Sequence, residues 1–230
     1  MKVVMFDLYD TILKDEAFDF DLGLDFLYKS IFYKYCTKDE LLTFANSLIP
    51  MFHNRIITFE ELSFIRKEIP LLFEKFSVTT NMNLDELDYQ FMLHTQKVAI
   101  LDEVIDYLTF LNKNNISMYI LSNTIFSTIS TKRLLEDFNI LHFFKEVYCS
   151  SEYGYRKPSL KFFEYGINKI LIDNPHCNRK NITYIGNDYQ TDIKGGINAG
   201  LNVIWYNVNK NQNMEQLPIL DIRSFRELIN

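Results

Sequence analysis

The sequence predicts an α/β protein built on a doubly wound parallel sheet with a helical insert. The chain opens on a short, uninterrupted apolar run, which is typical of a strand buried in a parallel sheet. Residues 18–96 then show helical periodicity, and strands alternate with helices after them. This alternation favours a Rossmann-like core. A chain of 230 residues that is 47% hydrophobic is long enough for that core and a smaller insert.

The first predicted strand covers residues 2–7 and is followed by polar residues. Its apolar, β-branched run ends at Asp7, and Tyr9, Asp10 and Thr11 come next. A carboxylate directly after a buried strand is a candidate functional residue, so the polar residues at the ends of the other predicted strands are of interest.

The insert is expected to be entirely helical. Apolar side chains recur at helical spacing at Leu24, Leu27, Ile31 and Tyr35. Two helix starts are predicted from capping boxes, one between Thr37 and Glu40 and one between Thr58 and Glu61. We find no convincing strand in this stretch, so residues 17–96 are predicted to form a helical cap domain.

The remaining chain alternates between the two kinds of element. We expect strands at residues 116–123, 146–151, 181–187 and 201–207, and helices at 102–115, 127–138, 159–171, 192–200 and 224–229. Ser159 and a Ser224–Glu227 capping box are predicted to start two of these helices, and Gly200 to close another. The polar stretch 209–218 is predicted to be a loop. The catalytic core therefore comprises residues 1–16 and 97–230.

Polar side chains follow four of the predicted strands. Asp7 ends the first, Ser122 the second, Lys157 follows the third, and Asp188 and Asp192 follow the fourth. Each residue alone is explained as a turn, cap or surface residue. Ligands bind at the carboxyl ends of the strands in such sheets, so we expect these side chains to share one rim. Together they supply a carboxylate nucleophile, a hydroxyl, a cation and a pair of acids.

In this order the four segments resemble the motifs of the haloacid dehalogenase-like (HAD) superfamily of hydrolases. The segments are VVMFDLYDTIL, YILSNT, YGYRKPSLKFFEYGI and ITYIGNDYQTDIKGGINAG. The resemblance covers roughly residues 1–16 and 98–207, and the helices between them match the family's cap in position. It implies that Asp7 is the nucleophile, that Thr11 supports it, that Ser122 with Asn123 contacts a substrate oxyanion, and that Lys157 is the cation.

The resemblance also implies a Mg²⁺ site. Its expected ligands are the side chains of Asp7, Asn187, Asp188 and Asp192 and the main-chain carbonyl of Tyr9. All are oxygen donors, which Mg²⁺ prefers. Asn187 stands where many relatives carry an acid, and an amide oxygen can still bind the metal.

Tyr9 departs from the pattern of the family's phosphatases, which carry an acid two residues after the nucleophile. A phenol with a pKa of about 10 is a poor general base at neutral pH. Asp10 follows it, but neighbouring side chains in extended backbone point in different directions. Tyrosine at this position is instead found in the family's 2-haloacid dehalogenases, which attack carbon and need no metal. The paired acids Asp188 and Asp192 favour a metal site, because unneutralised carboxylates beside Asp7 would repel it.

Three functions therefore remain open. We predict a Mg²⁺-dependent phosphohydrolase that acts on a small phosphorylated metabolite, weakened by Tyr9. The alternatives are a metal-independent 2-haloacid dehalogenase and a non-catalytic phosphate or ligand binder.

Composition restricts the partners and the compartment. A net charge of −6 gives no basic surface for nucleic acid, and no apolar run approaches the roughly 18 residues of a membrane span. The chain enters a strand at once, so we expect no signal peptide and a cytoplasmic protein. Cys36, Cys149 and Cys177 are expected to be reduced thiols. The partner is a small-molecule substrate, and the chain is expected to be a monomer or homodimer.

Two arginines of the predicted cap are candidates for contacts with an anionic substrate. Arg55 and Arg66 lie within the predicted cap, which would close over the strand ends. The simpler interpretation places both in solvated or salt-bridged surface.

Overall fold

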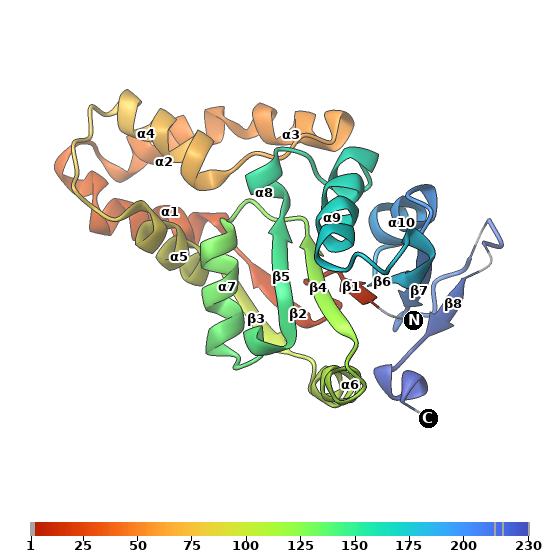
Figure 1. Cartoon of the computed structure of the whole chain (residues 1–230). Coiled ribbons are helices and arrows are strands. Elements are labelled where there is room, and N and C mark those ends of the chain that lie inside the picture. Colours follow the sequence, from red (N-terminus) through yellow and green to blue (C-terminus); the bar gives the residue numbers. More distant parts are fainter. Residues whose placement is uncertain (1–2, 214, 218, 230) are drawn as a thin grey trace.

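A six-stranded parallel sheet forms the centre of the larger part of the protein in the computed structural model (Figure 1). The strand order is β5-β4-β1-β6-β7-β8, with β1 Val3–Phe6, β4 Ser117–Ser122, β5 Phe144–Cys149, β6 Ile182–Gly186, β7 Asn202–Tyr206 and β8 Leu220–Ile222. Phe6 pairs with Ile120 on one side and with Ile185 on the other. The order reverses between β1 and β6, which is where open α/β sheets bind ligands.

The structure describes residues 3–213, 215–217 and 219–229. The predicted core ranges and the predicted first strand and loop also include residues 1, 2, 214, 218 and 230, which lie outside the described residues. No helix within the described ranges is long and apolar enough to cross a bilayer.

Helices cover both faces of the sheet, because successive residues of each strand point to opposite faces. Val4 and Phe6 pack in the cluster that includes α6 Asp102–Lys113 and α7 Thr128–Asp137. Val3 and Met5 pack in a second cluster with α9 Leu160–Asp173, while the short helices α8 Ser150–Tyr153 and α10 Gly195–Asn198 follow β5 and β6. This confirms the predicted doubly wound α/β core.

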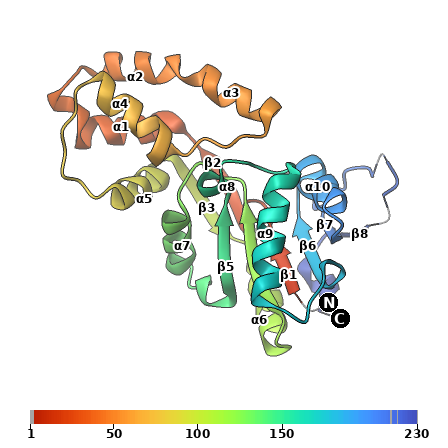
Figure 2. The same cartoon turned by 45° about the horizontal axis from the view of Figure 1, so that its top comes forward.

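A two-stranded antiparallel ribbon joins the sheet to the cap helices (Figure 2). It pairs β2 Leu13–Phe18 with β3 Gln96–Ile100. The prediction of no strand in residues 18–96 is wrong at both ends of that range. Five of the six residues of β2 are exposed, so the strand carries no hydrophobic pattern from which it could be recognised.

Five α-helices form most of the cap (Figure 1), and aromatic side chains pack in its interior. The helices are α1 Phe20–Ser30, α2 Lys38–Ser47, α3 Ile49–Thr58, α4 Ile69–Lys75 and α5 Leu84–Thr95. Phe64 and Phe91 stack with their ring centroids 3.7 Å apart, and Phe20 meets Phe91 edge to face at 5.3 Å. Such aromatic contacts bury large areas in a small helical unit.

Two of the four side-chain caps predicted from sequence are present. The Thr37–Glu40 and Ser224–Glu227 capping boxes are confirmed, although the last element is only a 3₁₀ turn, Phe225–Leu228. Ser159 begins α9 without a capping hydrogen bond. The Thr58–Glu61 box is wrong because α3 ends at Thr58 and Phe59 then adopts a left-handed φ of 56°.

Strand β8 was also missed, because it has only three residues and follows a polar loop. Predicted Gly200 is confirmed as the residue that ends the preceding helical segment, with a φ of +73° that favours glycine.

The cap contacts the core through α5 as well as through the ribbon. Asp88 of α5 is fully buried and accepts hydrogen bonds from the Ser127 N–H at 2.9 Å and the Ser130 hydroxyl at 2.6 Å. Both donors lie at the start of α7, where a carboxylate is favoured by the helix dipole. This contact fixes one side of the cap on the core.

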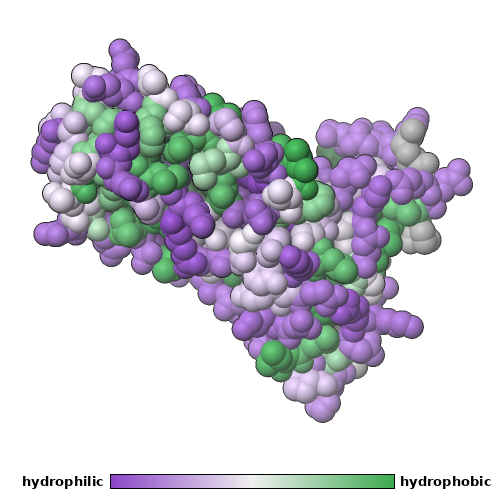
Figure 3. Space-filling view, turned by 90° about the horizontal axis from the view of Figure 1, so that it is seen from above, coloured by the Kyte–Doolittle hydropathy of each residue, from purple (hydrophilic) through white to green (hydrophobic). Residues whose placement is uncertain are grey.

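Helix α3 contributes little to the interior of the cap. Ile56 and Ile57 are 65% and 79% exposed, and Figure 3 shows apolar side chains interspersed with polar ones over the surface seen from above. Ile56 and Ile57 therefore remain on the outside of the cap.

Glu68 is an acid buried in the cap without a hydrogen-bond partner among the described residues. Burial raises its pKa to about 8, although Arg55 opposes the shift. The folded protein therefore holds a proton that the unfolded chain loses, and stability falls as the pH rises from about 4.5 towards 8.

Glu68→Met should raise the free energy of unfolding by about 2 kcal/mol near pH 8 and flatten its pH dependence. Urea denaturation at a series of pH values measures both effects. Glu74→Met changes an exposed acid nearby and should leave the profile within about 0.5 kcal/mol of the parent. Parallel profiles for the parent and Glu68→Met would contradict this account.

Candidate active site

A buried lysine, Lys157, connects the residue that follows β1 with β6 and the turn after β6. The Lys157 ammonium donates to Asp7 Oδ1 at 2.5 Å, to Asp192 Oδ1 at 2.7 Å and to the Tyr184 hydroxyl at 2.8 Å. Lys157 is 2% exposed, and Asp192 is equally inaccessible. All three donors of the ammonium are therefore used, and the cation is fixed beside Asp7.

Burial and charge oppose each other in this cluster. Desolvation raises the pKa of Asp7 to about 7, because the attraction of Lys157 does not fully offset it and Asp192 adds repulsion. Desolvation also disfavours the charged form of Lys157, but Asp192 and Asp7 outweigh it and raise its pKa. The lysine therefore stays protonated, and two acids share its single positive charge.

Asp192 is placed by a short helical turn and by a glycine. It lies in the π-helical turn Tyr189–Lys194, and a Cβ on Gly186 would come within 2.5 Å of its side chain. Its second oxygen, Oδ2, accepts the Asp188 N–H at 3.0 Å. Both carboxylate oxygens of this predicted metal ligand thus already hold hydrogen-bond donors, and the geometry makes Asp192 a positioning residue for Lys157.

Thr11 brings Asp7 and Asn187 together. Its hydroxyl lies 3.3 Å from Asp7 Oδ2 and 3.3 Å from Asn187 Oδ1. A hydroxyl carries one hydrogen, so it can serve only one of the two oxygens at a time. Two converging oxygens with one shared donor fit a Mg²⁺ ion, which usually binds one or two protein oxygens and keeps several waters.

Asp188, another predicted ligand, is directed elsewhere. It is exposed, and its Oδ1 accepts the Thr191 N–H at 2.6 Å and the Thr191 hydroxyl at 2.9 Å. Its carboxylate caps the following turn. The described residues contain no group of three or more His, Cys, Asp or Glu side chains that could hold a metal.

The end of β4 supplies Ser122 and Asn123. Asn123 makes a reciprocal pair with the main chain of Lys157, accepting its N–H at 2.8 Å and donating to its carbonyl at 3.1 Å. The Ser122 hydroxyl is fully buried and lacks a hydrogen-bond partner within the part of the chain that the structure describes. Asn123 thus positions Lys157, while Ser122 has an unused donor.

Tyr9 points towards the ribbon. Its hydroxyl accepts a hydrogen bond from Gln96 of β3 at 3.2 Å, and burial raises its pKa far above the ordinary value of 10. The phenol is therefore neutral. Asp10 has a left-handed φ of 56° and accepts the Asp15 N–H, so its carboxylate does not occupy the position of the Tyr9 side chain.

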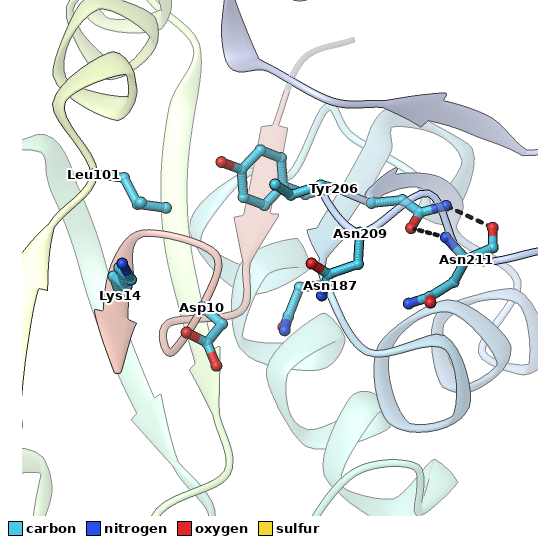
Figure 4. A pocket seen from close by; sticks show the side chains of 9 residues that line it. Asp10, Lys14, Leu101, Asn187, Tyr206, Asn209 and Asn211 are labelled. Atoms are coloured by element: carbon cyan, nitrogen blue, oxygen red, sulfur yellow. Dashed lines mark hydrogen bonds between the residues drawn. The ribbon is translucent and has the colours of Figure 1, made fainter. Parts of the chain in front are cut away.

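Two hollows flank these residues. One, of about 240 Å³, lies where the cap meets the core and is lined by Tyr9, Asp15, Phe18, Arg55, Glu61, Gln96, Asn123, Thr124, Ile125, Phe126 and Arg156. The other, of about 410 Å³, includes Asp10, Lys14, Asn187 and Tyr206 (Figure 4). Asn187 lines the second hollow and contacts Thr11, so it connects that hollow to the Asp7 cluster.

Three residues of the site were missed as contributors. Tyr184 is one residue of an apolar strand, and only the strand register places its hydroxyl at Lys157. Glu61 was assigned to a capping box, whereas it is buried and pairs with Arg55 at 2.9 Å. Arg156 directly precedes Lys157 in the segment YGYRKPSLKFFEYGI. Its position next to Lys157 is the sequence feature that could have identified it as a residue of the site. Arg66 pairs instead with Glu152 on the surface.

The site combines a parallel α/β sheet with an aspartate and a lysine that are paired near its strand ends. This arrangement is typical of a class of hydrolases, and comparison with known proteins identifies the family. A family model described as haloacid dehalogenase-like hydrolase matches residues 4–206. The chain belongs to this family.

Relatives and solved structures extend the comparison. The chain is 28% identical over 229 residues to a putative HAD-hydrolase, YfnB, of Bacillus subtilis, covering 99% of this chain and 93% of the relative. It is 27% identical over 232 residues to the pyrimidine 5′-nucleotidase PynA of Streptococcus pneumoniae, covering 100% and 94%. A 2-haloacid dehalogenase structure from Pseudomonas syringae superimposes with a TM-score of 0.67 at 20% identity, covering 99% and 96%.

Replacing the buried lysine should destabilise the fold. Lys157→Met keeps the volume but leaves Asp7 and Asp192 without their shared cation, so we expect a loss of about 3 kcal/mol near neutral pH. The loss should shrink as the pH falls below about 7, the raised pKa of Asp7, because protonation of Asp7 removes one of the two charges that the lysine compensates. Denaturant unfolding measures it.

Lys161→Met is the matched control, since Lys161 is exposed on α9 and should change stability by less than about 0.5 kcal/mol. Equal effects of the two substitutions would show that Lys157 does not hold the acids together.

Proposed function

We propose that this protein is a Mg²⁺-dependent phosphohydrolase that acts on a small phosphorylated metabolite, with Asp7 as its nucleophile. The observation that carries the proposal is the buried Lys157 held between Asp7 and Asp192. A carboxylate that attacks a phosphate ester brings two anions together, so a fixed cation beside the nucleophile is the group this reaction needs.

In the proposed reaction an oxygen of Asp7 forms a bond to phosphorus as the bond to the ester oxygen breaks. The electron pair leaves with that oxygen, which takes a proton from water. Water then attacks the phosphorus of the aspartyl phosphate, releasing inorganic phosphate and restoring Asp7. Lys157 stabilises negative charge on the transferred group in both steps.

The side chains of Asp7 and Asn187 and the main-chain carbonyl of Tyr9 would hold Mg²⁺. The support is the pair of oxygens that share the Thr11 hydroxyl. A bound Mg²⁺ would neutralise negative charge on the phosphoryl oxygens. A solved structure of the relative YfnB is described as bound to magnesium. Asp192 contributes by holding Lys157, and Asp188 by ordering the turn that carries Asp192.

Ser122 is proposed to donate to an oxygen of the substrate. Its buried hydroxyl has no partner within the described ranges, and leaving such a group unpaired is costly. Asn123 acts on the main chain of Lys157 and is a positioning residue. Thr11 orients Asp7 in the same sense.

Tyr9 limits the proposed reaction. Its neutral phenol can donate a hydrogen bond but cannot activate water at neutral pH, because its pKa is raised by burial. The second step, hydrolysis of the aspartyl phosphate, is therefore expected to be slow.

The same observation supports a second candidate, a metal-independent 2-haloacid dehalogenase. Asp7 would attack carbon, halide would leave with its electron pair, and water would hydrolyse the resulting ester. The leaving halide needs no proton, so the absence of an acid at position 9 would not slow its departure.

Hydrolysis of p-nitrophenyl phosphate, with Mg²⁺ and with excess EDTA, separates these candidates. The proposed function predicts turnover that requires Mg²⁺ and disappears in Asp7→Asn. Halide release from 2-chloropropionate in EDTA would favour the dehalogenase instead. Binding of beryllofluoride without turnover of either compound would indicate a non-catalytic ligand binder and contradict the proposal.

Restoring an acid at position 9 should increase the rate. Tyr9→Asp supplies a group able to protonate the leaving oxygen and activate water, and we expect a gain of roughly 10- to 100-fold in kcat. Tyr9→Asn is the matched control, because it removes the same ring without adding an acid. A folded Tyr9→Asp protein that gains no more than Tyr9→Asn would show that Tyr9 does not limit the reaction.

A further inference from the structure

The hollow of about 240 Å³ between cap and core contains two arginines and one buried acid. Arg55 comes from the last turn of α3, Arg156 precedes Lys157, and Glu61 belongs to the cap segment that follows α3. Glu61 is 6% exposed, so its charge requires compensation from within the protein.

Glu61 obtains that compensation without Arg156. Its Oε1 accepts from Arg55 at 2.9 Å and from the Leu62 N–H at 3.1 Å, and Oε2 accepts from the Ser150 hydroxyl at 3.0 Å. Arg156 Nε lies 3.8 Å from Oε2, which is beyond hydrogen-bond distance. The acid is therefore satisfied chiefly by Arg55 and Ser150.

Arg156 has donors to spare. Its side chain is only 21% exposed and makes no hydrogen bond within the described part of the chain; its contact with Glu61 is an ion pair at 3.8 Å. Desolvation lowers the pKa of its guanidinium. The charge of Glu61 opposes this effect, and the positive charge of Arg55 adds to it. A guanidinium that is largely removed from water normally uses its fork of N–H groups on an acceptor.

The backbone holds this arginine in place. The Arg156 N–H donates to the Phe59 carbonyl of the cap at 2.8 Å, and the Arg156 carbonyl accepts the Ser159 N–H at 2.9 Å. The backbone that carries this side chain is thus anchored where cap and core meet.

The hollow also adjoins the nucleophile. Tyr9 and Asn123 line it, the first two residues from Asp7 and the second bonded to the main chain of Lys157. A molecule in this hollow would therefore contact Arg156 and lie beside two residues that flank Asp7 and Lys157. A volume of about 240 Å³ is below the roughly 300–1,000 Å³ of typical drug-sized ligand sites, so that molecule is small. Asp15 also lines the hollow, but its exposure to water screens its charge.

We propose that Arg156 binds a carboxylate of the substrate, so that the substrates are small phosphate esters that also carry a carboxylate group. Planar guanidinium and carboxylate groups pair through two parallel hydrogen bonds, which fixes orientation as well as position. The inference rests on the proposed function for the role of the phosphate, whereas the carboxylate contact can be tested by binding alone.

The test compares two esters that differ at one carbon. 3-Phosphoglycerate carries a carboxylate where glycerol 3-phosphate carries a hydroxymethyl group. Calorimetric titration into the Asp7→Asn protein, which avoids turnover, should show 3-phosphoglycerate binding roughly 10- to 100-fold more tightly. Adding Arg156→Gln should abolish that preference, and Arg156→Lys should retain part of it because the charge remains without the fork.

Arg66→Gln serves as the matched control, since Arg66 is a cap arginine paired with Glu152 and its side chain is 59% exposed. It should leave the preference for 3-phosphoglycerate intact. Thermal unfolding verifies that each variant is folded. If Arg156→Gln does not fold, the preference for 3-phosphoglycerate is tested with Arg156→Lys alone. Equal binding of the two esters, no binding of either, or an unchanged preference in a folded Arg156 variant would overturn the inference.

The two proposals fail in different ways. A carboxylate preference that depends on Arg156, in a protein that hydrolyses no phosphate ester, would refute the proposed function and leave the contact standing. Mg²⁺-dependent hydrolysis without any carboxylate preference would refute the contact alone.

Discussion

The ammonium of Lys157, buried between Asp7 and Asp192, is the interaction on which the rest of the site depends. Asp7 directly follows β1 and Asp192 lies in the helical turn after β6, and two desolvated acids so close together would repel each other strongly. The lysine uses all of its donors on Asp7, Asp192 and Tyr184, and Asn123 fixes its main chain from β4. The cluster therefore ties β1, β4, β6 and the segment after β5 together at one rim of the sheet. Lys157 therefore both balances the charge of the two acids and fixes the position of Asp7, the proposed nucleophile.

The residues proposed for recognition and for reaction lie on one short segment. Arg156 and Lys157 are adjacent, and Arg156 lines the hollow beneath the cap while Lys157 holds Asp7, the proposed nucleophile. The cap closes this hollow through backbone contacts, in which Glu61 N–H donates to the Gly154 carbonyl and Phe64 N–H to the Ile125 carbonyl. A substrate that bridges Arg156 and Asp7 would thus be oriented by rigid backbone on both sides, which is how positioning contributes to catalysis.

The sequence predicted the sheet, its helical insert and the convergence of Asp7 and Lys157, because parallel strands bring their carboxyl ends to one edge. It could not separate Asp188 from Asp192: both follow β6, and only the helical turn after the strand directs one inward and the other to Thr191. The role of Tyr184 could not be predicted, because the sequence pattern of a buried strand does not distinguish a tyrosine of the site from a tyrosine of the hydrophobic core. The ribbon was missed because β2 is exposed at five of its six residues and lacks a hydrophobic pattern. The role of Glu61 was missed because its pairing with Arg55 depends on the tertiary structure.

A covalent phosphoryl group on Asp7 is the most direct test of the central claim. Because Tyr9 activates water poorly, the aspartyl phosphate should form faster than it is hydrolysed and should accumulate. Acid-quenched protein, mixed with p-nitrophenyl phosphate and Mg²⁺ and then mapped by peptide mass spectrometry, should carry one phosphoryl group on the peptide that contains Asp7. Ester hydrolysis with Asp7 unmodified under these conditions, or a phosphoryl group on another residue, would contradict the account.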